Sequence, residues 1–552
     1  MHLSRPPSAR LALTLALSLA QHALAQTAPD AGQTLQQIQP PVLQTPRLEQ
    51  GIDMQASSAS AAQPGGASVL INSLLFAGNT QFTAAELHDV LGKESGKTYD
   101  LAGLQDLAER ISQHYRSKGY PFARAFLSAQ PIAEGVLRID VVEGQYDQII
   151  VTGDADLAAQ AQGFLSALHP GDVIQSTPLE RASLILSDQP GIIASPLIRP
   201  GGKEGTGDLE INLKRSALVA GDAALDNQGS HYTGKHRVRA NLYINSPFLL
   251  GDQMTLRTLV SELGMWSANL DYSVPLGTSG LRAQAGYAHT YYELGNEFAT
   301  LKASGTAQVS TVGLKYPLVR SQQSNLSLNA TWQGKDLNDK QDTAGTHSNK
   351  SSQTLPLALS FDHRDNLAGG GISYGTISHT SGELQLESAL RATDASTAQS
   401  QGAFSKMNLD IARIQSLQPA LSLFGRVSAQ WADKNLDSSE KFGLGGSSGV
   451  RAYPGGEGFG DRGWLVQLEM RYSTGDYAPY VFIDSGDVST NTKPWDAAAN
   501  QRALSGAGLG LRYQHAGWSL DASAAWRSEG GKPLTETSAS DPMVWLNLAY
   551  KF

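Results

Sequence analysis

The sequence predicts a transmembrane β-barrel preceded by two small α+β modules, and three observations support this fold class. The first 25 residues have the composition of a secretory signal, which indicates that the chain leaves the cytoplasm. Over residues 69–215, segments whose apolar residues have helical spacing alternate with segments whose apolar residues have strand-like spacing. From residue 216 onward apolar and polar residues alternate, and no apolar run of about 18 residues occurs. Strands that cross lipid must close into a barrel, because lipid offers backbone groups no hydrogen-bond partner.

Residues 1–25 are predicted to be a signal peptide. Arg5 and Arg10 precede the apolar segment Leu11–Ala20, and the small residues Ala23 and Ala25 form a cleavage site. We therefore expect the mature chain to begin after Ala25.

Charge and cysteine content exclude several classes of function. The 552 residues carry a net charge of −9, which argues against a nucleic-acid binder, because such a protein needs a basic surface. Cysteine is absent, so thiol catalysis and cysteine-ligated metal sites are excluded. A chain without cysteine also suits an oxidising compartment. We expect no cofactor and no metal.

Residues 26–50 form a leader, and residues 51–68 form a flexible linker. Within the leader, Ala31–Gln39 is compatible with a short helix that ends before Pro40 and Pro41, and this helix is a candidate plug for the pore. An unstructured leader is equally compatible with the composition. The linker has almost no large apolar side chain.

Residues 69–145 and 146–215 are predicted to form two modules of similar order. In the first, a strand at Val69–Phe76 precedes a helix that begins at Thr83, with Glu86 completing a capping box. The remaining predicted elements are a helix over Leu101–Lys118, strands over Ala123–Ala129 and Gly135–Glu143, and, in the second module, a strand at Gln148–Val151, helices over Leu157–Leu168 and Thr177–Ser187, and a strand over Gly207–Lys214.

Residues 216–552 are predicted to form the barrel. Arg237–Ile244 alternates clearly, and Val544–Phe552 places only apolar residues on one face. Sixteen strands would use about 21 residues each, connection included, where about 9–11 are needed to cross, and fourteen or eighteen strands would also fit. Polar stretches such as Gly334–Ser352 are interpreted as turns. A soluble β-sandwich is the alternative.

Four enzyme-like motifs lack the context that their chemistry requires. Gly92–Thr98 has one residue too few for a phosphate-binding loop and follows a helix, so we interpret it as a turn between helices. Ser447 lies in a G-x-S-x-G motif with strand-like flanks, and not at a strand–turn–helix elbow. Gly506–Gly510 is interpreted as a barrel strand, and His363 as a polar residue at the end of a strand.

The most informative pattern is a glycine-rich run, Phe442–Pro454, followed about 30 residues later by Val481–Gly486. Such a run is compatible with a loop that bends into a wide barrel and carries Arg451 inward. A buried guanidinium needs an acidic partner, and Asp484 on an inferred strand can supply two carboxylate contacts. Two unrelated surface residues are the alternative.

These motifs resemble those of the TpsB family, the outer-membrane transporters of two-partner secretion. Val450–Tyr453 resembles the V-R-G-Y motif at the tip of the family's sixth extracellular loop, and Phe482–Gly486 resembles its F-x-D-x-G strand motif. Segments 225–229 and 233–234, before 250–252, resemble its first barrel hairpin. The resemblance covers the mature chain and implies POTRA modules for residues 69–215. The residues to which it assigns a role are Val450, Arg451, Ala452, Tyr453, Phe482, Asp484 and Gly486 in the loop and its contact, and Tyr550 and Phe552 in the barrel-assembly signal.

One residue departs from the family pattern. Ala452 stands where glycine is usual, and its methyl group narrows the backbone freedom of the loop tip. The effect on the tip conformation is not predicted by the sequence, whereas the Arg451–Asp484 pairing is expected to be kept.

The resemblance implies export of a large secreted exoprotein with an N-terminal secretion domain. The modules would bind the unfolded partner in the periplasm, for example by adding its strands to a sheet edge, and the barrel would pass it without ATP. In this mechanism Arg451 and Asp484 form a latch, meaning a contact that holds the loop, and the protein is not an enzyme. Further expected partners are outer-membrane lipids, the barrel-assembly machinery and periplasmic chaperones.

Three other functions are compatible with parts of the sequence. A barrel-insertion factor has a similar fold but usually carries more modules. An outer-membrane hydrolase would need partners for Ser447 or His363. A diffusion porin would leave the periplasmic modules without a purpose.

Overall fold

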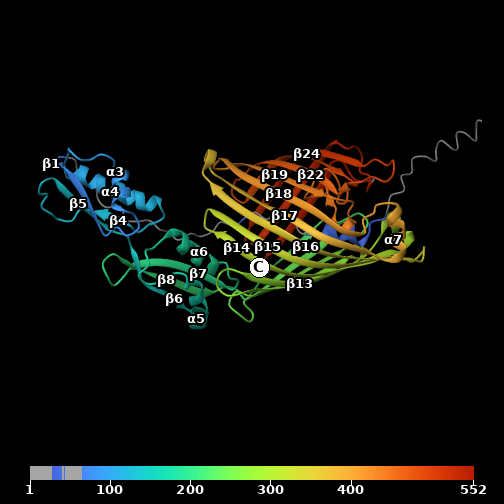
Figure 1. Cartoon of the computed structure of the whole chain (residues 1–552). Helices are drawn as coiled ribbons and strands as arrows, with labels where there is room; N and C mark the ends of the chain where they lie inside the picture. Colours follow the sequence, from blue (N-terminus) through green and yellow to red (C-terminus); the bar gives the residue numbers. More distant parts are fainter. Residues whose placement is uncertain (1–27, 40–42, 44–45, 47–64, 537) are drawn as a thin grey trace, which may run out of the picture.

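A computed structural model describes residues 28–39, 43, 46, 65–536 and 538–552. The predicted signal peptide and most of the predicted linker lie outside these residues. Figure 1 shows the two modules in a row, followed by a barrel. Among the described residues, no helix is both long and apolar enough to cross a membrane. The barrel end next to the modules is called the near end below, and the opposite end the far end.

The first module packs two helices on a small sheet. Its elements are β1 (Val69–Ile71), β2 (Ser73–Ala77), α3 (Ala84–Leu91), β3 (Lys97–Tyr99), α4 (Leu101–Ser117), β4 (Arg124–Phe126) and β5 (Val136–Val142). The strands β2, β5 and β4 form one sheet in that order, and β1 pairs with β3. The core is apolar and includes Leu87, Ile111 and Ile139.

Local signals placed the helices of this module well and its short strands less well. The Thr83 side chain caps α3 and Glu86 completes the capping box. These hydrogen bonds from Thr83 lower the pKa of Glu86. The single predicted strand is divided at Asn72, where the backbone turns to donate to the Gly135 carbonyl. The predicted turn at Gly92–Thr98 is partly wrong, since its last two residues begin β3.

The second module repeats this design. Its elements are β6 (Gln145–Gly153), α5 (Ala155–Ala161), η1 (Gln162–Leu165), α6 (Ser176–Ser187), β7 (Ile192–Pro200) and β8 (Thr206–Arg215), with the sheet order β6-β8-β7. The helix predicted over Leu157–Leu168 tightens into a 3₁₀ turn at Gln162. Strand β7 was not predicted; it contains Pro196 and Pro200, which a strand tolerates at a sheet edge, where β7 lies.

The barrel is a closed ring of sixteen antiparallel strands among the described residues, which confirms the predicted fold class. The strands are β9 (Val219–Asp226), β10 (Arg237–Asn245), β11 (Gln253–Ser261), β12 (Trp266–Pro275), β13 (Arg282–Glu293), β14 (Ala303–Arg320), β15 (Ser324–Gln341), β16 (Thr346–Asp365), β17 (Gly371–Leu386), β18 (Gly402–Gln418), β19 (Leu421–Ala432), β22 (Arg462–Tyr472), β23 (Tyr477–Ser489), β24 (Gln501–His515), β25 (Trp518–Glu529) and β26 (Met543–Lys551). The ring closes where β26 pairs with β9 through only five residue pairs, from Asn547–Asp226 to Lys551–Asp222.

The outer face of the barrel is suited to lipid. Exposed aromatic side chains gather in two belts, as in membrane barrels. The belt toward the far end includes Trp266, Trp431, Trp464 and Trp526, and the belt toward the near end includes Tyr472, Tyr477, Trp518, Tyr550 and Phe552.

The strands β14–β17 are much longer than a bilayer requires. The prediction that Gly334–Ser352 is turn-like is wrong. These residues belong to β15 and β16, apart from the tight connection 342–345. A strand that continues beyond the lipid has no need for apolar residues on its outer face, so it loses the alternation on which the prediction relied. Shorter elements at the barrel ends are η2 (Asn296–Leu301), η3 (Leu367–Gly369) and α7 (Ser388–Ser396).

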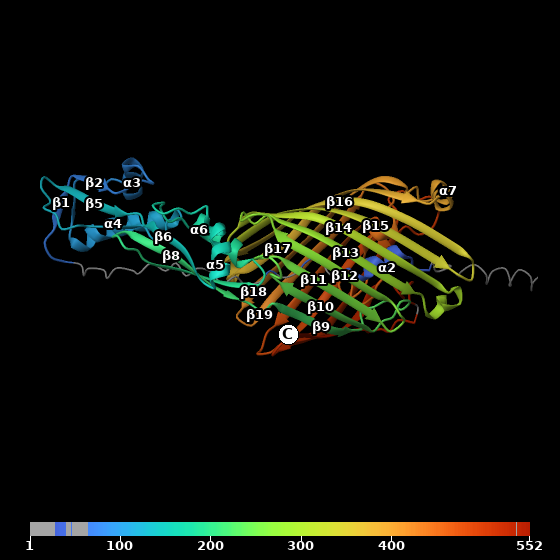
Figure 2. The ribbon, with the colours of Figure 1, turned by 90° about the horizontal axis from the view of Figure 1, so that it is seen from below.

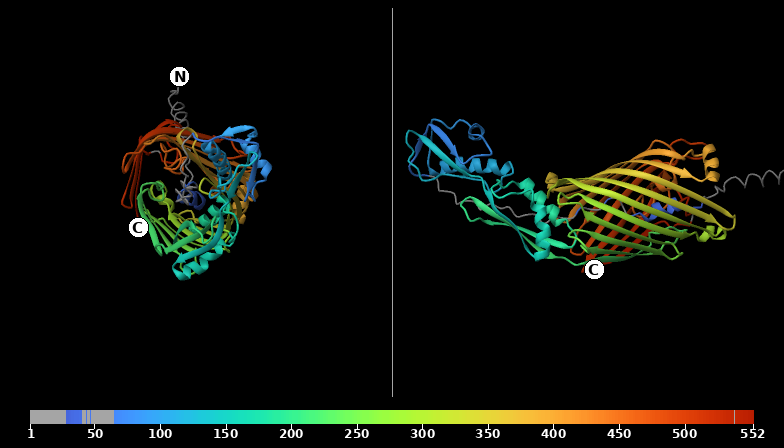
Figure 3. Two further views of the ribbon diagram at one scale, coloured as in Figure 1. Left: turned by 90° about the vertical axis from the view of Figure 1, so that its left-hand side faces the viewer. Right: turned by 60° about the horizontal axis from the view of Figure 1, so that its bottom comes forward.

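Two segments occupy the interior of the barrel. The helix α2 (Ala31–Ile38) lies within the ring of strands, as Figures 2 and 3 show. The connection 433–461 between β19 and β22, called the inward loop below, contains η4 (Ser438–Glu440), β20 (Phe442–Gly443) and β21 (Phe459–Gly460). Strands β20 and β21 pair with each other, so residues 444–458 form the end of a hairpin.

Candidate functional site

The glycines of the inward loop allow its backbone to fold tightly. Gly446 has a φ of +105°, which side chains disfavour. A Cβ at Gly449 would overlap the carbonyl oxygen of Leu444, and a Cβ at Gly445 would lie 2.5 Å from the oxygen of Pro454. The G-x-S-x-G pattern around Ser447 therefore serves backbone packing.

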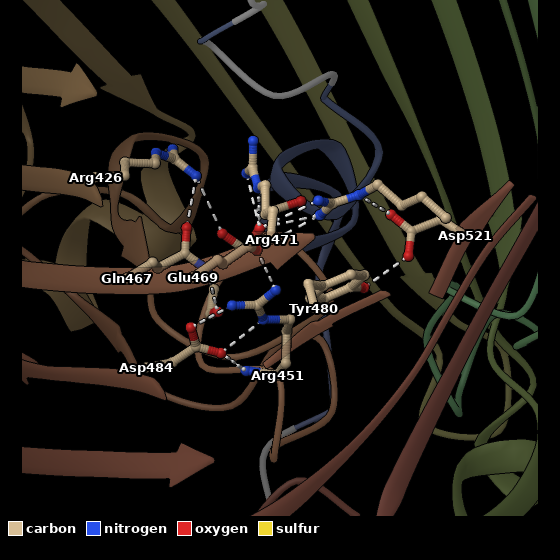
Figure 4. Close-up of polar contacts among 11 residues, drawn as sticks. Arg426, Arg451, Gln467, Glu469, Arg471, Tyr480, Asp484 and Asp521 are labelled. Atoms are coloured by element: carbon tan, nitrogen blue, oxygen red, sulfur yellow. Dashed lines mark hydrogen bonds and ion pairs between the residues drawn. The ribbon is translucent and has the colours of Figure 1, made fainter. Parts of the chain in front are cut away.

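Arg451 extends from this loop to the inner face of β22 and β23 (Figure 4). Its Nε donates to Asp484 Oδ2 at 2.8 Å and its Nη2 to Asp484 Oδ1 at 2.7 Å. The Arg451 backbone N–H also donates to Asp484, at 3.1 Å. The Phe482 ring lies 3.5 Å from the guanidinium carbon, in a cation–π contact. Arg451 and Asp484 are 5% and 2% exposed, so the structure brings the two residues together in a buried, fork-shaped pair.

Glu469 on β22 is a second acidic partner that sequence reasoning missed. Its Oε1 accepts from Arg451 Nη1 at 2.5 Å, and its carboxylate also binds Arg471 and Arg512. The signal for Glu469 was present, since it lies between Leu468 and Met470, both of which face outward. Strand alternation therefore turns its carboxylate into the barrel.

The neighbours of Arg451 on the loop are packed against the last three barrel strands. Val450 and Ala452 are fully buried. A Cβ added at Gly506 on β24 would overlap the Ala452 methyl, so these two positions are complementary in shape. The Tyr453 hydroxyl lies 2.6 Å from the Glu529 carbonyl, and Trp545 Nε1 on β26 donates to the Arg451 carbonyl at 2.7 Å.

The remaining predicted residues lie at two places. Gly486 on β23 leaves room for the loop, since a Cβ there would overlap the Leu444 side chain. Tyr550 and Phe552 face outward at the near end, and Phe552 exchanges two backbone hydrogen bonds with Gly221 on β9. Their role as an assembly signal stays a prediction.

The helix α2 is held between the barrel wall and the inward loop. Asp30 caps the helix by accepting from Gln33 N, and the same carboxylate binds Lys350 on β16 at 2.8 Å and the Ser438 hydroxyl at 2.7 Å. A Cβ at Gly32 would overlap Ser438, so the loop touches the helix backbone directly. The helix and the loop thus form one packed unit inside the barrel.

The enzyme-like motifs do not converge on a reactive centre. Ser447 lies in the tip of the inward loop. His363 lies close to the last residue of β16, at the near end of the barrel, where its ring contacts the Ser324 hydroxyl at 2.7 Å. Within the described ranges, no group of three histidine, aspartate or glutamate residues is placed to hold a metal ion.

Comparison with known proteins identifies relatives that match most of the chain. The family model "Haemolysin secretion/activation protein ShlB/FhaC/HecB" matches residues 205–513, and the model "POTRA domain, ShlB-type" matches residues 69–144. The chain is 27% identical over 489 residues to the heme/hemopexin transporter protein HuxB of Haemophilus influenzae, covering 86% of this chain and 85% of the relative. It is 23% identical to the outer membrane transporter CdiB of Escherichia coli, covering 83% and 81%. The solved structure of CdiB from Escherichia coli matches the fold with a TM-score of 0.72 at 20% identity, covering 92% of this chain and 94% of that one.

Proposed function

Because the chain belongs to the ShlB/FhaC/HecB family of haemolysin secretion/activation proteins, the TpsB transporters, we propose that it binds one unfolded exoprotein in the periplasm and exports it through its barrel without ATP. Members of this family are outer-membrane transporters that work with secreted partners. The barrel therefore spans the outer membrane, and the POTRA modules lie in the periplasm, at the near end. The observation that carries the proposal is the barrel interior, which contains a loop and a helix that no strand pairing in the described part of the chain joins to the wall and whose ion pairs and hydrogen bonds can be exchanged for water.

The modules supply the binding surface for the partner. The edge strands of their three-stranded sheets are β2, β4, β6 and β7, and an edge strand is where a strand of the partner could be added. Pro196 and Pro200 have no backbone N–H, and prolines on edge strands lie where that N–H would point away from the sheet. The free edge of β7 therefore lacks two of the donors that an added strand would need. This argues against β7, and we favour β2 of the first module, where Leu75 is 55% exposed and can contact an added strand.

Passage requires α2 and the inward loop to move. The contacts that hold them include ion pairs and hydrogen bonds, such as Asp30–Lys350 and Arg451–Asp484, in addition to apolar packing against the barrel wall. Net hydrogen-bond free energies in water are small, so a polypeptide that enters from the modules can compete for these groups. Folding of the partner outside removes it from the exchange and gives direction to the transport.

The Arg451–Asp484 pair serves as the latch of this loop and has no catalytic part. The finer partners of the proposal are an exoprotein with an N-terminal secretion domain and, during biogenesis, periplasmic chaperones and the barrel-assembly machinery, which would read Tyr550 and Phe552.

We expect the gene for a large β-repeat exoprotein beside the gene for this protein, and the test compares culture supernatants of cells that express this exoprotein with and without the transporter. We expect the exoprotein in the medium only when the transporter is present. An unchanged amount in the medium without the transporter would refute the proposal. Depletion of cytoplasmic ATP after the exoprotein has reached the periplasm should leave its export intact.

A further inference from the structure

In the connection between β25 and β26, residues 530–536 contact the inward loop at the far end of the barrel. Of this connection, residues 530–536 are called the lid below. Pro533 and Glu536 of the lid are buried, although the lid lies outside the strands. A surface loop with buried side chains is held by specific contacts.

Glu457 of the inward loop is the centre of these contacts. Its side chain is 1% exposed. One carboxylate oxygen accepts from Leu534 N at 2.9 Å, from Thr535 N at 3.0 Å and from the Thr535 hydroxyl at 2.8 Å. The other oxygen accepts from Arg502 Nε and Nη2 at 2.9 and 2.6 Å. A carboxylate with five donors is fully satisfied, so this geometry is specific to a negative charge.

Arg502 on β24, which pairs with Glu457, also binds the beginning of the lid. Its Nη1 donates to the Gly530 carbonyl at 2.6 Å, and its Nη2 to the Lys532 carbonyl at 3.2 Å. The Tyr453 hydroxyl lies 2.9 Å from the Gly531 carbonyl. The inward loop and β24 together bind the lid along most of its length.

The other end of the lid reaches the connection between β9 and β10. The Tyr232 hydroxyl donates to the Thr535 carbonyl, and Lys235 forms an ion pair with Glu536. Strands β26 and β9 close the ring. The lid precedes β26 in the chain, so it links the inward loop to the connection that follows β9.

We propose that Glu457 is a positioning residue that ties residues 530–536 to the inward loop at the far end of the barrel, so that the loop leaves its closed position more often when this tie is lost. Glu457 lies six positions after Arg451 on the same hairpin end, so displacement of the Arg451 tip withdraws the carboxylate from Leu534 and Thr535. The inference goes beyond the proposed function, because it concerns the closed state in the absence of any exoprotein.

The direct test is the Glu457→Gln variant, which keeps the shape of the side chain and removes its charge. The NH2 of the new amide would replace one of the two acceptor oxygens, so that N–H donors would face either the lid N–H groups or Arg502, and Arg502 would lose its ion pair. Removing the charge from one partner of a buried ion pair weakens the contact by about 1.4 kcal/mol or more, which corresponds to about a tenfold or greater change in population. In planar bilayers containing the purified mature protein alone, we expect the fraction of time spent open to rise about tenfold or more.

The matched control is Glu529→Gln, which removes an exposed carboxylate at the start of the same connection. It should conduct like the unmodified protein. Cells that carry Glu457→Gln should admit vancomycin, whereas they should still secrete the exoprotein, since Arg451 and Asp484 are intact. An unchanged open fraction for Glu457→Gln would overturn the inference without touching the transport function.

A milder variant covers the case in which Glu457→Gln does not assemble. Thr535→Val removes only the hydroxyl donor and leaves both backbone donors in place, so a rise in open fraction of about threefold is expected from the loss of one such hydrogen bond. Heat-modifiable migration on gels reports assembly of each variant. A correctly assembled Thr535→Val barrel that opens no more often than the unmodified protein would contradict the lid contact.

Discussion

Replacement of Arg451 by alanine is expected to stop secretion while the barrel still assembles. The side chain makes two hydrogen bonds to Asp484, one to Glu469 and a cation–π contact with Phe482. These contacts hold the loop and contribute nothing to the strand pairing of the barrel. The substitution therefore acts on the position of the loop.

The size of the effect follows from what remains after the substitution. Removing one partner of a buried ion pair costs about 3–5 kcal/mol, because the other charge is left buried. Glu469 keeps Arg471 and Arg512, whereas Asp484 keeps only the backbone N–H of residue 451. We therefore expect the lower part of that range, about 3 kcal/mol, which corresponds to a shift of the seated loop population by about a hundredfold.

The assay measures exoprotein in the medium by immunoblot and barrel assembly by heat-modifiable gel migration. Protease sensitivity of the inward loop in intact cells reports its displacement. Arg451→Lys should restore only part of the secretion, because an ammonium group cannot make the forked contact. The control Arg462→Ala removes an exposed arginine at the start of β22 and should secrete normally. Wild-type secretion by Arg451→Ala would refute the latch.

Three further predictions concern other contacts. Gly32→Leu should displace α2 and raise the single-channel conductance, because the new side chain would overlap the inward loop; unchanged conductance would mean that α2 does not block the pore. Gly506→Ala should reduce secretion severalfold, and the double variant with Ala452→Gly should restore it, because the second change returns the space that the first one takes; no rescue would contradict the packing of these two positions. The pKa of Glu86 is lowered, so its contribution to the stability of the first module is fully present above the ordinary glutamate pKa and is lost as the pH falls through the lowered value. Thr83→Ala removes the cap of α3 and should lower the unfolding free energy of the module by about 1 kcal/mol at neutral pH. It should also remove this acid dependence, as chemical denaturation of the full chain can show.

The sequence was most informative where local physics determines the structure. The capping box at Thr83 and the alternation over Val544–Phe552 placed a helix and a strand, since caps and side-chain alternation depend on few neighbours. The same rule failed for β7 and for the ends of β15 and β16, where an edge position or water on both faces relaxes the usual composition.

The pairing of Arg451 with Asp484 was predictable from the sequence, whereas the residues that surround this pair were not. Arg451 and Asp484 were matched by motif and by the need to neutralise a buried guanidinium. The sharing of Glu469, the contact from Trp545 and the five donors of Glu457 depend on strands up to 94 residues away along the chain, which no local pattern encodes. The consequence of Ala452 was likewise invisible until Gly506 was found opposite its methyl group.

The pairing of β26 with β9 also constrains how the protein is made. The residues that complete the ring, Asp222–Asp226 and Asn547–Lys551, are separated by more than half of the polypeptide. Contacts between such distant segments form late, because the entropy of closing so long a stretch must be overcome first. The terminal strand must therefore be synthesised and delivered before the wall is complete, and a chain cut short by even ten residues should be degraded instead of inserted.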